Sequence, residues 1–228
     1  MKSSVDRVFR AARIWSNDEL GKIASFYKGR VINVSAGEDI DKQGKTYEQY
    51  FTEAESYWLS NYSPGAFRGY AGRENELLID LTAPLPKEHQ RSFDVALNHT
   101  TLEHIFEVKT AFHNLCELSS DTVILIVPFC QVQHENVGYQ DFWRFTPTCL
   151  RRMFADEGME VIYESADNQF NTSVYLFVVA SRNPERWREK MPSWKPLEKV
   201  ASWVGRDIVS YRDLMKLLKR RITHHFTR

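Results

Sequence analysis

One stretch near the middle of the chain decides the fold, and it reads Phe93-Asp94-Val95-Ala96-Leu97-Asn98-His99-Thr100-Thr101-Leu102-Glu103-His104. Its apolar run, from Val95 to Leu97, stops abruptly at polar residues, and an amphipathic segment follows. This pattern predicts a buried strand that enters a helix through a polar turn. In an open α/β sheet, ligands bind at such carboxyl ends of strands.

Length and composition indicate an ordinary globular protein. The 228 residues suffice for one α/β domain with appendages or for two small domains, and 43% of them are hydrophobic and 26% charged. The formal net charge is zero, so no overall field attracts nucleic acid. No apolar run is long enough to span a membrane as a helix.

Cysteine usage gives an expectation about the cellular compartment. The three cysteines, Cys116, Cys130 and Cys149, lie far apart, and the sequence holds no CxxC pair. Neither a zinc site nor a redox motif is therefore indicated. An odd number of cysteines without a signal peptide favours a reducing environment, so we expect a cytoplasmic location.

Apolar runs predict seven strands, most of them followed by helical spacing or by turn residues. The predicted strands are 31–34, 57–59, 77–80, 93–98, 122–127, 159–163 and 174–180, and Pro128 is expected to stop the fifth. Helices are expected as one or two segments within 5–27 and as one segment at 105–118. A further helix is expected after Thr146, which can cap it, with Pro147 in its first turn and Gly158 at its end.

The two last strands are joined by a short polar link, Glu164 to Ser173, which has no helical pattern. A parallel crossover needs more length and usually a helix, so these strands are expected to pair antiparallel. The remainder alternates strands with helices, which predicts an α/β fold with a mostly parallel sheet and helices on both faces. Residues 38–57 are interpreted as a helix or an ordered loop that covers this sheet.

Composition divides the chain into an N-terminal helical segment at 1–27, an α/β domain at 28–182 and a C-terminal segment at 183–228. The C-terminal segment begins with a linker containing Trp and Pro. It ends in a predicted helix with basic residues between apolar ones, most densely at 212–228. Such a helix can lie peripherally on the inner face of a membrane or bind a partner protein, or it can pack on its own domain.

Four segments resemble the class I S-adenosylmethionine (SAM)-dependent methyltransferase family. Residues 28–38 resemble its first motif, a strand followed by a glycine-containing turn, and residues 78–86 resemble the segment with an acidic residue after strand 3. Residues 92–105 resemble strand 4 and the helix after it. Residues 127–146 resemble a methyltransferase type 11-like subgroup linked to bacterial polysaccharide and glycan biosynthesis. The resemblance implies a Rossmann-like sheet of seven strands with a terminal antiparallel pair.

The resemblance also implies that SAM is the cofactor and that it binds at the carboxyl ends of the strands. The residues that match the cofactor positions of the family are Ser35, Ala36, Gly37, Glu38, Asn61, Asp80, Leu81, Asn98, His99 and Thr100. Glu38 would lie near the sulfonium or the amino group of SAM, and Asp80 near the adenine. Structural roles remain open for both, with Glu38 in a solvated acidic loop and Asp80 in a cap or turn.

Two positions depart from the family pattern. The first turn holds one glycine, Gly37, where the family has two or three, although Ser35 and Ala36 are small enough for close approach. The acidic residue that binds the ribose hydroxyls at the end of strand 2 is replaced by Asn61, which loses charge assistance. These departures predict weak cofactor binding or its loss.

The end of strand 4 is expected to line the passage between cofactor and acceptor, through Asn98, His99 and Thr100. Glu103 and His104 follow and are expected in the first helical turn. There the helix dipole explains the carboxylate of Glu103. Packing explains His104 better than a role as a base does.

Catalytic groups are expected in the loop after strand 5. His134 can take a proton from an acceptor hydroxyl, Asp141 can orient His134, and Arg144 can hold a phosphate or carboxylate of the acceptor. The alternative is that Asp141 and Arg144 pair with each other and hold the loop against Trp143.

The sequence thus predicts a SAM-dependent methyltransferase that acts on an oxygen atom of a sugar or of a lipid-linked glycan. The alternative is a non-catalytic methyltransferase-fold protein that binds or scaffolds and has lost SAM binding, which the glycine-poor turn and Asn61 favour. A nucleotide-binding oxidoreductase is disfavoured, because the chain has no GxGxxG and the predicted sheet finishes with an antiparallel pair.

Overall fold

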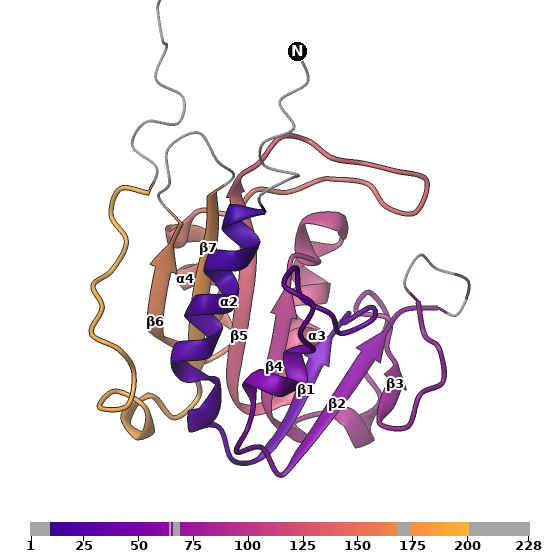
Figure 1. The fold of residues 1–228 in the computed structure, drawn as a ribbon, viewed down its shortest axis with the longest axis horizontal. Helices are drawn as coiled ribbons and strands as arrows, with labels where there is room; N and C mark the ends of the chain where they lie inside the picture. Colours follow the sequence, from indigo (N-terminus) through magenta and orange to yellow (C-terminus); the bar gives the residue numbers. More distant parts are fainter. Residues whose placement is uncertain (1–9, 64, 66–68, 168–173, 201–228) are drawn as a thin grey trace, which may run out of the picture.

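The computed structural model describes residues 10–63, 65, 69–167 and 174–200, which form one sheet covered by helices. The sheet has seven strands in the order β3-β2-β1-β4-β5-β7-β6 (Figure 1). The strands are β1 Arg30–Val34, β2 Ser56–Asn61, β3 Glu76–Leu78, β4 Phe93–His99, β5 Ser119–Cys130, β6 Glu160–Ala166 and β7 Val174–Ser181.

The direction of the strands places the carboxyl ends of β1 and β4 side by side. The strands from β3 to β5 run parallel, whereas β7 pairs antiparallel with both β5 and β6. After β1 the chain adds β2 and β3 on one side and then returns to add β4 on the other. Val34 of β1 lies opposite Asn98 of β4 in this register. The ends of these two strands therefore form the switch point at which α/β sheets bind ligands.

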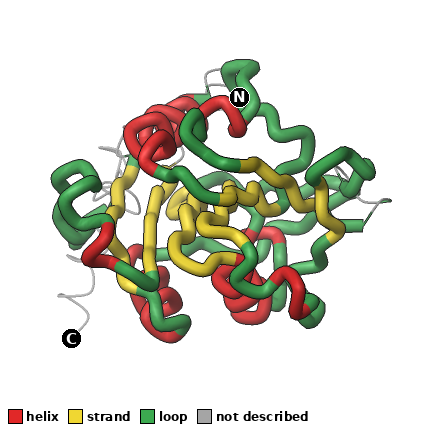
Figure 2. Tube along the Cα trace, turned by 90° about the horizontal axis from the view of Figure 1, so that it is seen from below, coloured by secondary structure: helices red, strands yellow, loops and turns green. Residues whose placement is uncertain are grey.

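Side chains on the strands alternate between two hydrophobic cores, one on each face of the sheet. Ala96 belongs to the core under α3 (Val108–Leu118) and α4 (Pro147–Asp156), while its neighbour Leu97 belongs to the core under α2 (Ala11–Ile23). Figure 2 shows the sheet between helices on both sides. Because both faces are covered, the central strands are apolar almost throughout, as is typical of parallel sheets.

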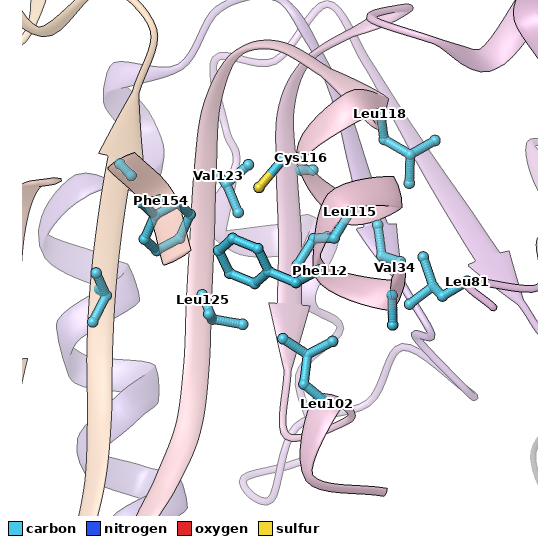
Figure 3. Packing of buried hydrophobic residues seen from close by; sticks show 14 of the residues in the cluster. Val34, Leu81, Leu102, Phe112, Leu115, Cys116, Leu118, Val123, Leu125 and Phe154 are labelled. Carbon is cyan, nitrogen blue, oxygen red and sulfur yellow. The ribbon is translucent and has the colours of Figure 1, made fainter. Parts of the chain in front are cut away.

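Aromatic rings organise the core on the side of α3 and α4. Phe112 meets Phe154 edge to face, with ring centroids 4.8 Å apart. Leu115 and Leu125 lie close to Phe112 in the same cluster (Figure 3). This packing holds both helices on the sheet and therefore positions the loops that lead into them.

The helices expected within 5–27, at 105–118 and after Thr146 are present, and the bounds of the last have clear local causes. The Thr146 side chain accepts a hydrogen bond of 3.1 Å from the Cys149 backbone N–H, and Pro147 opens α4. Gly158 follows the helix with φ of 68°, a conformation that glycine adopts without strain. The helix predicted at 105–118 begins later, at Val108.

The predicted fold class is confirmed, with one correction inside β5. Pro128 was expected to stop this strand, but the strand continues to Cys130 and Pro128 lies opposite Tyr175 of β7. β4 pairs with β5 only as far as Ile126. One side of β5 therefore carries no ladder at Pro128, and the missing N–H is tolerated there.

An ordered loop, and not an α-helix, joins β1 to β2. Residues 35–55 are all described, and their helical part is the short 3-10 turn Tyr47–Tyr50. The carboxylate of Asp41 is buried inside this loop and organises it. Asp41 accepts hydrogen bonds from the backbone N–H groups of Gln43 and Lys45 and from the hydroxyl of Tyr50.

The described part of the C-terminal segment returns to the sheet. Trp187 is buried, its ring centroid lies 4.8 Å from that of Tyr27, and its Nε1 donates a hydrogen bond of 3.0 Å to Asp121. The basic helix expected at 206–228 lies outside the described residues, as do residues 1–9. No helix in the described part of the chain has the length and apolar composition needed to span a bilayer.

Two glycines near the start of the sheet should respond oppositely to substitution by alanine. A Cβ at Gly29 would lie 2.1 Å from Oδ2 of Asp94, which accepts a hydrogen bond of 2.7 Å from the Arg30 backbone N–H. We expect Gly29→Ala to lower the free energy of unfolding by about 1–3 kcal/mol, because Asp94 must move.

At Gly21, in α2, the atom nearest to an added Cβ would lie at 3.9 Å. Gly21→Ala should raise the free energy of unfolding by about 0.5–1 kcal/mol, because alanine favours a helix more than glycine does. Chemical denaturation measures both, and equal effects would contradict this account.

Candidate functional site

The turn after β1 has the backbone shape of a ligand-binding turn with few of the expected glycines. Ser35 has φ of 59° and Gly37 has φ of 62°. The left-handed conformation costs a serine about 1–2 kcal/mol, which the surrounding structure has to offset. The predicted cofactor residues Ser35, Ala36 and Gly37 therefore do lie at the carboxyl end of β1, beside β4.

Asn61 holds this turn closed from the end of β2. Its Oδ1 accepts a hydrogen bond of 2.7 Å from the Gly37 N–H, and its Nδ2 donates to the Gly37 carbonyl at 3.1 Å and to Glu76 at 2.6 Å. Arg73 adds a second donor to the Gly37 carbonyl, at 2.8 Å. Asn61 itself is 2% exposed. Its amide is therefore engaged by the protein at the position where the family binds the ribose.

The two carboxylates after this turn take different environments. Glu38 is exposed, as a solvated acidic loop requires. Asp39 is buried, and its Oδ1 accepts hydrogen bonds from Asn33 at 2.7 Å and from the Tyr57 hydroxyl at 2.8 Å. Burial raises the pKa of Asp39 above its ordinary value, although these two hydrogen bonds act in the opposite direction. Asp39 thus holds the loop to the sheet.

Asp80 and Leu81 build a turn after β3. The carboxylate of Asp80 accepts hydrogen bonds from the backbone N–H of Thr82 at 2.8 Å and from its hydroxyl at 2.7 Å. Leu81 is buried in the core, and its carbonyl accepts a hydrogen bond from Asn114. These contacts place Asp80 in the structural role that the sequence left open, that of a turn residue.

The end of β4 carries a buried polar group that lacks a partner. Nδ2 of Asn98 donates a hydrogen bond of 2.9 Å to the Val34 carbonyl and so joins β4 to β1. Oδ1 of Asn98 is buried without a hydrogen-bond partner among the described residues. Thr100 takes a left-handed conformation, with φ of 51°, and its N–H donates to the Ile126 carbonyl. An unsatisfied buried acceptor at a strand end is uncommon and marks this position for a donor.

His99 faces the N-terminal helix, a contact that the sequence did not indicate. Nη1 of Arg13 lies 2.8 Å from Nδ1 of His99, and Oγ of Ser16 lies 2.8 Å from Nε2. A guanidinium only donates, so Nδ1 accepts and Nε2 carries the hydrogen that it donates to Ser16. Burial and the positive charge of Arg13 hold the pKa of His99 well below its ordinary value. His99 is therefore neutral and fixed in one tautomer.

The loop after β5 brings His134, Asp141 and Arg144 together. Arg144 donates two hydrogen bonds to the Asp141 carboxylate, at 2.6 and 2.7 Å, and further ones to the carbonyls of Trp143 and Gln131. Burial opposes ionisation of Asp141, but the bonds from Arg144 and from the His134 N–H lower the pKa of Asp141 to about 2. Arg144 therefore holds the loop, as the alternative interpretation of the sequence proposed.

His134 lies beside Asp141, but its ring Nδ1 is buried without a hydrogen-bond partner among the described residues. Its Nδ1 lies 3.3 Å from Oδ2 of Asp141. The rings of His104 and Tyr139 surround it, with centroids 5.0 and 5.8 Å away. Burial lowers the pKa of His134, although the Asp141 charge opposes this. The imidazole is therefore neutral and able to accept a proton near pH 7.

Glu103 is the site residue that the sequence interpretation missed. It lies in a 3-10 turn, Leu102–His104, ahead of α3, so the expected stabilisation by the first turn of a helix does not apply. Its side chain is 0% exposed, and neither carboxylate oxygen has a hydrogen-bond partner among the described residues. Burial raises the pKa of Glu103 to about 7, although the charges of Arg13 and Arg144 oppose the rise.

Glu103 anchors the loop that carries His134. The Glu103 carbonyl accepts hydrogen bonds from the backbone N–H groups of Phe142 and Trp143. His104 donates through Nδ1 to the Gln140 carbonyl at 2.6 Å, and its Nε2 lies 3.8 Å from Oε1 of Glu103. The loop thus packs against the segment that carries Glu103, and the sequence pattern of Glu103 alone does not reveal this contact.

The buried carboxyl group should make stability depend on pH in a defined direction. Between its ordinary pKa and about 7, the folded protein holds a proton on Glu103 that the unfolded chain has released. The wild type therefore loses about 3 kcal/mol through this group as pH rises across that range. Glu103→Gln removes the effect. Its free energy of unfolding relative to wild type should be higher at pH 8 than at pH 4 by about this amount.

The exposed residue Glu107 provides the control for this measurement. Denaturant unfolding of Glu107→Gln should show a difference from wild type that is the same at both pH values. A similarly flat difference for Glu103→Gln would show that Glu103 is ionised in the folded protein.

Comparison with known proteins was made at the level of families, curated proteins and solved structures. No family model and no curated protein matches the chain. Among solved structures, magnesium protoporphyrin IX methyltransferase from Synechocystis PCC 6803 with bound SAM is 13% identical, with a TM-score of 0.54 over 80% of this chain and 85% of the other. The putative methyltransferase in a complex with the Trm112 activator from Haloferax volcanii is also 13% identical, with a TM-score of 0.54 over 78% and 93%.

A third structure, 1,6-didemethyltoxoflavin-N1-methyltransferase from Burkholderia thailandensis with its substrate and S-adenosylhomocysteine (SAH), is 14% identical. Its TM-score is 0.50 over 78% of this chain and 87% of the other. At these identities the likeness concerns the fold alone. The chain has the Rossmann-like, seven-stranded fold that these methyltransferases share.

Proposed function

We propose that this protein is a SAM-dependent methyltransferase that methylates a hydroxyl group of a small-molecule acceptor, either a sugar or a lipid-linked glycan. The observation that carries the proposal is the meeting of the β1 turn with the end of β4. This is the switch point of the sheet, and a buried, unpartnered oxygen of Asn98 lies there. A loop with ionisable side chains follows β5 on the same edge.

The residues present fit the amino-acid end of SAM better than its ribose. The small residues Ser35, Ala36 and Gly37 allow close approach to the end of β1, and Oδ1 of Asn98 offers an acceptor to an ammonium group. At the ribose position, Asn61 is engaged by Gly37 and Glu76. We therefore propose that binding relies on the β1 and β4 ends and that the ribose contributes little affinity.

In the proposed reaction, the protein supplies alignment and a base. Bound SAM would provide an electrophilic methyl group on its sulfonium, so that positioning of the acceptor accounts for much of the rate. Asp141, next to Nδ1 of His134, favours the tautomer that leaves Nε2 free to accept the proton of the acceptor hydroxyl. Arg144 acts on Asp141 and keeps it ionised.

The acceptor class rests on two supports. The segment 127–146 resembles methyltransferases linked to glycan biosynthesis. Two of the structural neighbours carry the names of small-molecule substrates, magnesium protoporphyrin IX and 1,6-didemethyltoxoflavin. Both supports favour a small-molecule acceptor, whereas the choice of an oxygen atom rests on the first support alone, because the 1,6-didemethyltoxoflavin enzyme is an N1-methyltransferase.

A second function, binding or scaffolding without catalysis, is favoured by one observation. Every strong hydrogen-bonding group of the Asn61 amide is used inside the protein, and the Gly37 N–H is used as well. A cofactor that needs these groups would have to break bonds that are almost wholly buried. The two functions differ in a simple way, since only the first requires affinity for SAM.

Calorimetric titration of the full chain with SAM and with SAH separates the two functions. We expect both to bind with dissociation constants in the micromolar to submillimolar range, weaker than a charge-assisted ribose contact would give. A matching rise of the melting temperature should accompany binding. No heat and no thermal shift at millimolar ligand would leave the scaffolding function as the better proposal.

Replacement of His134 tests the assignment of the base. In an assay of SAH formation with a panel of sugars and lipid-linked sugars, His134→Ala should lower kcat by about 10²–10⁴-fold. Because the pKa of His134 is lowered, the acid limb of the wild-type pH profile should lie below the ordinary histidine value. Gln133→Ala, an exposed position in the same loop, is the control. An unchanged rate in His134→Ala would remove His134 from the mechanism.

A further inference from the structure

Arg13 is a positive charge in the centre of the site, and no described carboxylate pairs with it. It extends from the first turn of α2, its guanidinium lies 2.8 Å from Nδ1 of His99, and it lies 5.8 Å from the centroid of the Tyr175 ring. Among the described residues, Arg13 forms no ion pair within 4.0 Å. Other arginines of this fold do, for example Arg144 with Asp141 and Arg182 with Glu117.

The partners of Arg13 are neutral, so they hold its position without cancelling its charge. His99 is a neutral imidazole, and its Nε2–H, the Ser16 hydroxyl and the Arg13 carbonyl form a closed chain of hydrogen bonds. Tyr175 and Tyr47 contribute phenol groups. Burial alone would lower the pKa of Arg13, but the negative charge that Tyr175, Tyr47 and Glu103 carry when they ionise outweighs it, and the pKa is raised. Arg13 therefore stays charged.

Glu103, the carboxyl group whose charge acts on Arg13, compensates this charge only in part near neutral pH. Glu103 is buried with a pKa of about 7, so about half of it carries a proton there. A further positive charge, Lys42, acts on His99 from the β1–β2 loop. A half-buried guanidinium without a fixed counterion, placed where the ends of β1 and β4 meet, favours an incoming anion.

We propose that Arg13 forms an anion subsite of the binding site, which receives a carboxylate or phosphate group of a ligand. This role was expected of Arg144, whose donors are instead occupied by Asp141 and by two carbonyls. The inference deepens the proposed function, on which its choice of probes rests. The anion has two possible sources, the amino-acid carboxylate of the cofactor or an acidic group of the acceptor.

The first experiment compares two ligands on the wild type by calorimetry. SAH carries a carboxylate, whereas methylthioadenosine has the same thioether and adenosine without one. If Arg13 holds the cofactor carboxylate, SAH should bind roughly ten- to hundredfold more tightly than methylthioadenosine. Arg13→Gln should remove this advantage and leave the affinity for methylthioadenosine unchanged.

Two variants separate charge from folding. Arg13→Lys keeps the positive charge and should retain part of the SAH preference, because lysine lacks the planar fork. Arg30→Gln makes the same change of net charge at the opposite end of β1, where the guanidinium lies 4.9 Å from the centroid of Phe93. It should bind both ligands as the wild type does. If Arg13→Gln lost affinity for SAH and for methylthioadenosine to the same extent, Arg13 would have a packing role only.

Inorganic phosphate serves as the second probe and does not depend on SAM binding. Phosphate should raise the melting temperature of the wild type and of Arg30→Gln, but not that of Arg13→Gln. Competition by SAH would identify the cofactor as the source of the anion, and additive binding would identify the acceptor. Phosphate binding through Arg13 without any SAH affinity would support the subsite and overturn the methyltransferase proposal. No anion dependence in either experiment overturns the subsite.

Discussion

A single hydrogen bond of 2.9 Å, from the Asn98 amide to the Val34 carbonyl, ties the two central strands together at their carboxyl ends. Beyond this point the backbone leaves β1 and β4 in different directions, into the β1 turn and into the turn that carries Glu103. The bond fixes the distance between those turns, and both faces of the sheet are packed on either side of it. Together with the parallel ladder between β1 and β4, that junction sets the relative position of the two turns.

The edge is rich in polar groups whose partners are neutral or missing. Asn98 has an oxygen without a donor, Glu103 a carboxyl group without a donor, and Arg13 a charge without a counterion. Each of these arrangements costs free energy in an isolated domain. Asp39 and Asp41, in the loop that follows β1 at this same edge, are instead engaged by hydrogen bonds. Other buried atoms without a partner occur elsewhere in the described chain, for example on Thr122 and Glu164, but these three groups lie close to the end of β4, where α/β sheets bind ligands.

The sequence was informative wherever a local pattern determines the structure. β-branched and apolar runs predicted the strands, and Thr146, Pro147 and Gly158 predicted the bounds of α4. The same patterns placed Asn98 and His99 at a strand end. They failed for Pro128, because tolerance of a proline depends on where the neighbouring strand stops. A local sequence pattern is thus sufficient to predict a helix or strand, but insufficient to predict an end that depends on a neighbouring strand.

The interactions within the site could not be predicted, because they join residues that are distant in the chain. Asn61 replaces the acidic residue of the family pattern, but its effect depends on Gly37 and Glu76. Glu103 was explained by a helix start that lies five residues further on, and its burial depends on the loop after β5. Arg13 belongs to a helix with no motif, and its importance follows from its contact with His99 alone.

The contact of Arg13 with Tyr175 has a consequence for how the protein acquires its site. Arg13 comes from the first described helix and Tyr175 from β7, the last of the described strands along the chain, which inserts between β5 and β6. A nascent chain that has completed β1 to β5 already possesses the junction of β1 and β4, but it lacks half of the aromatic surroundings of Arg13. Contacts of such long sequence separation form late in folding. The proposed anion subsite is therefore complete only after β7 has joined the sheet, because a partly folded molecule without β7 lacks Tyr175 beside Arg13.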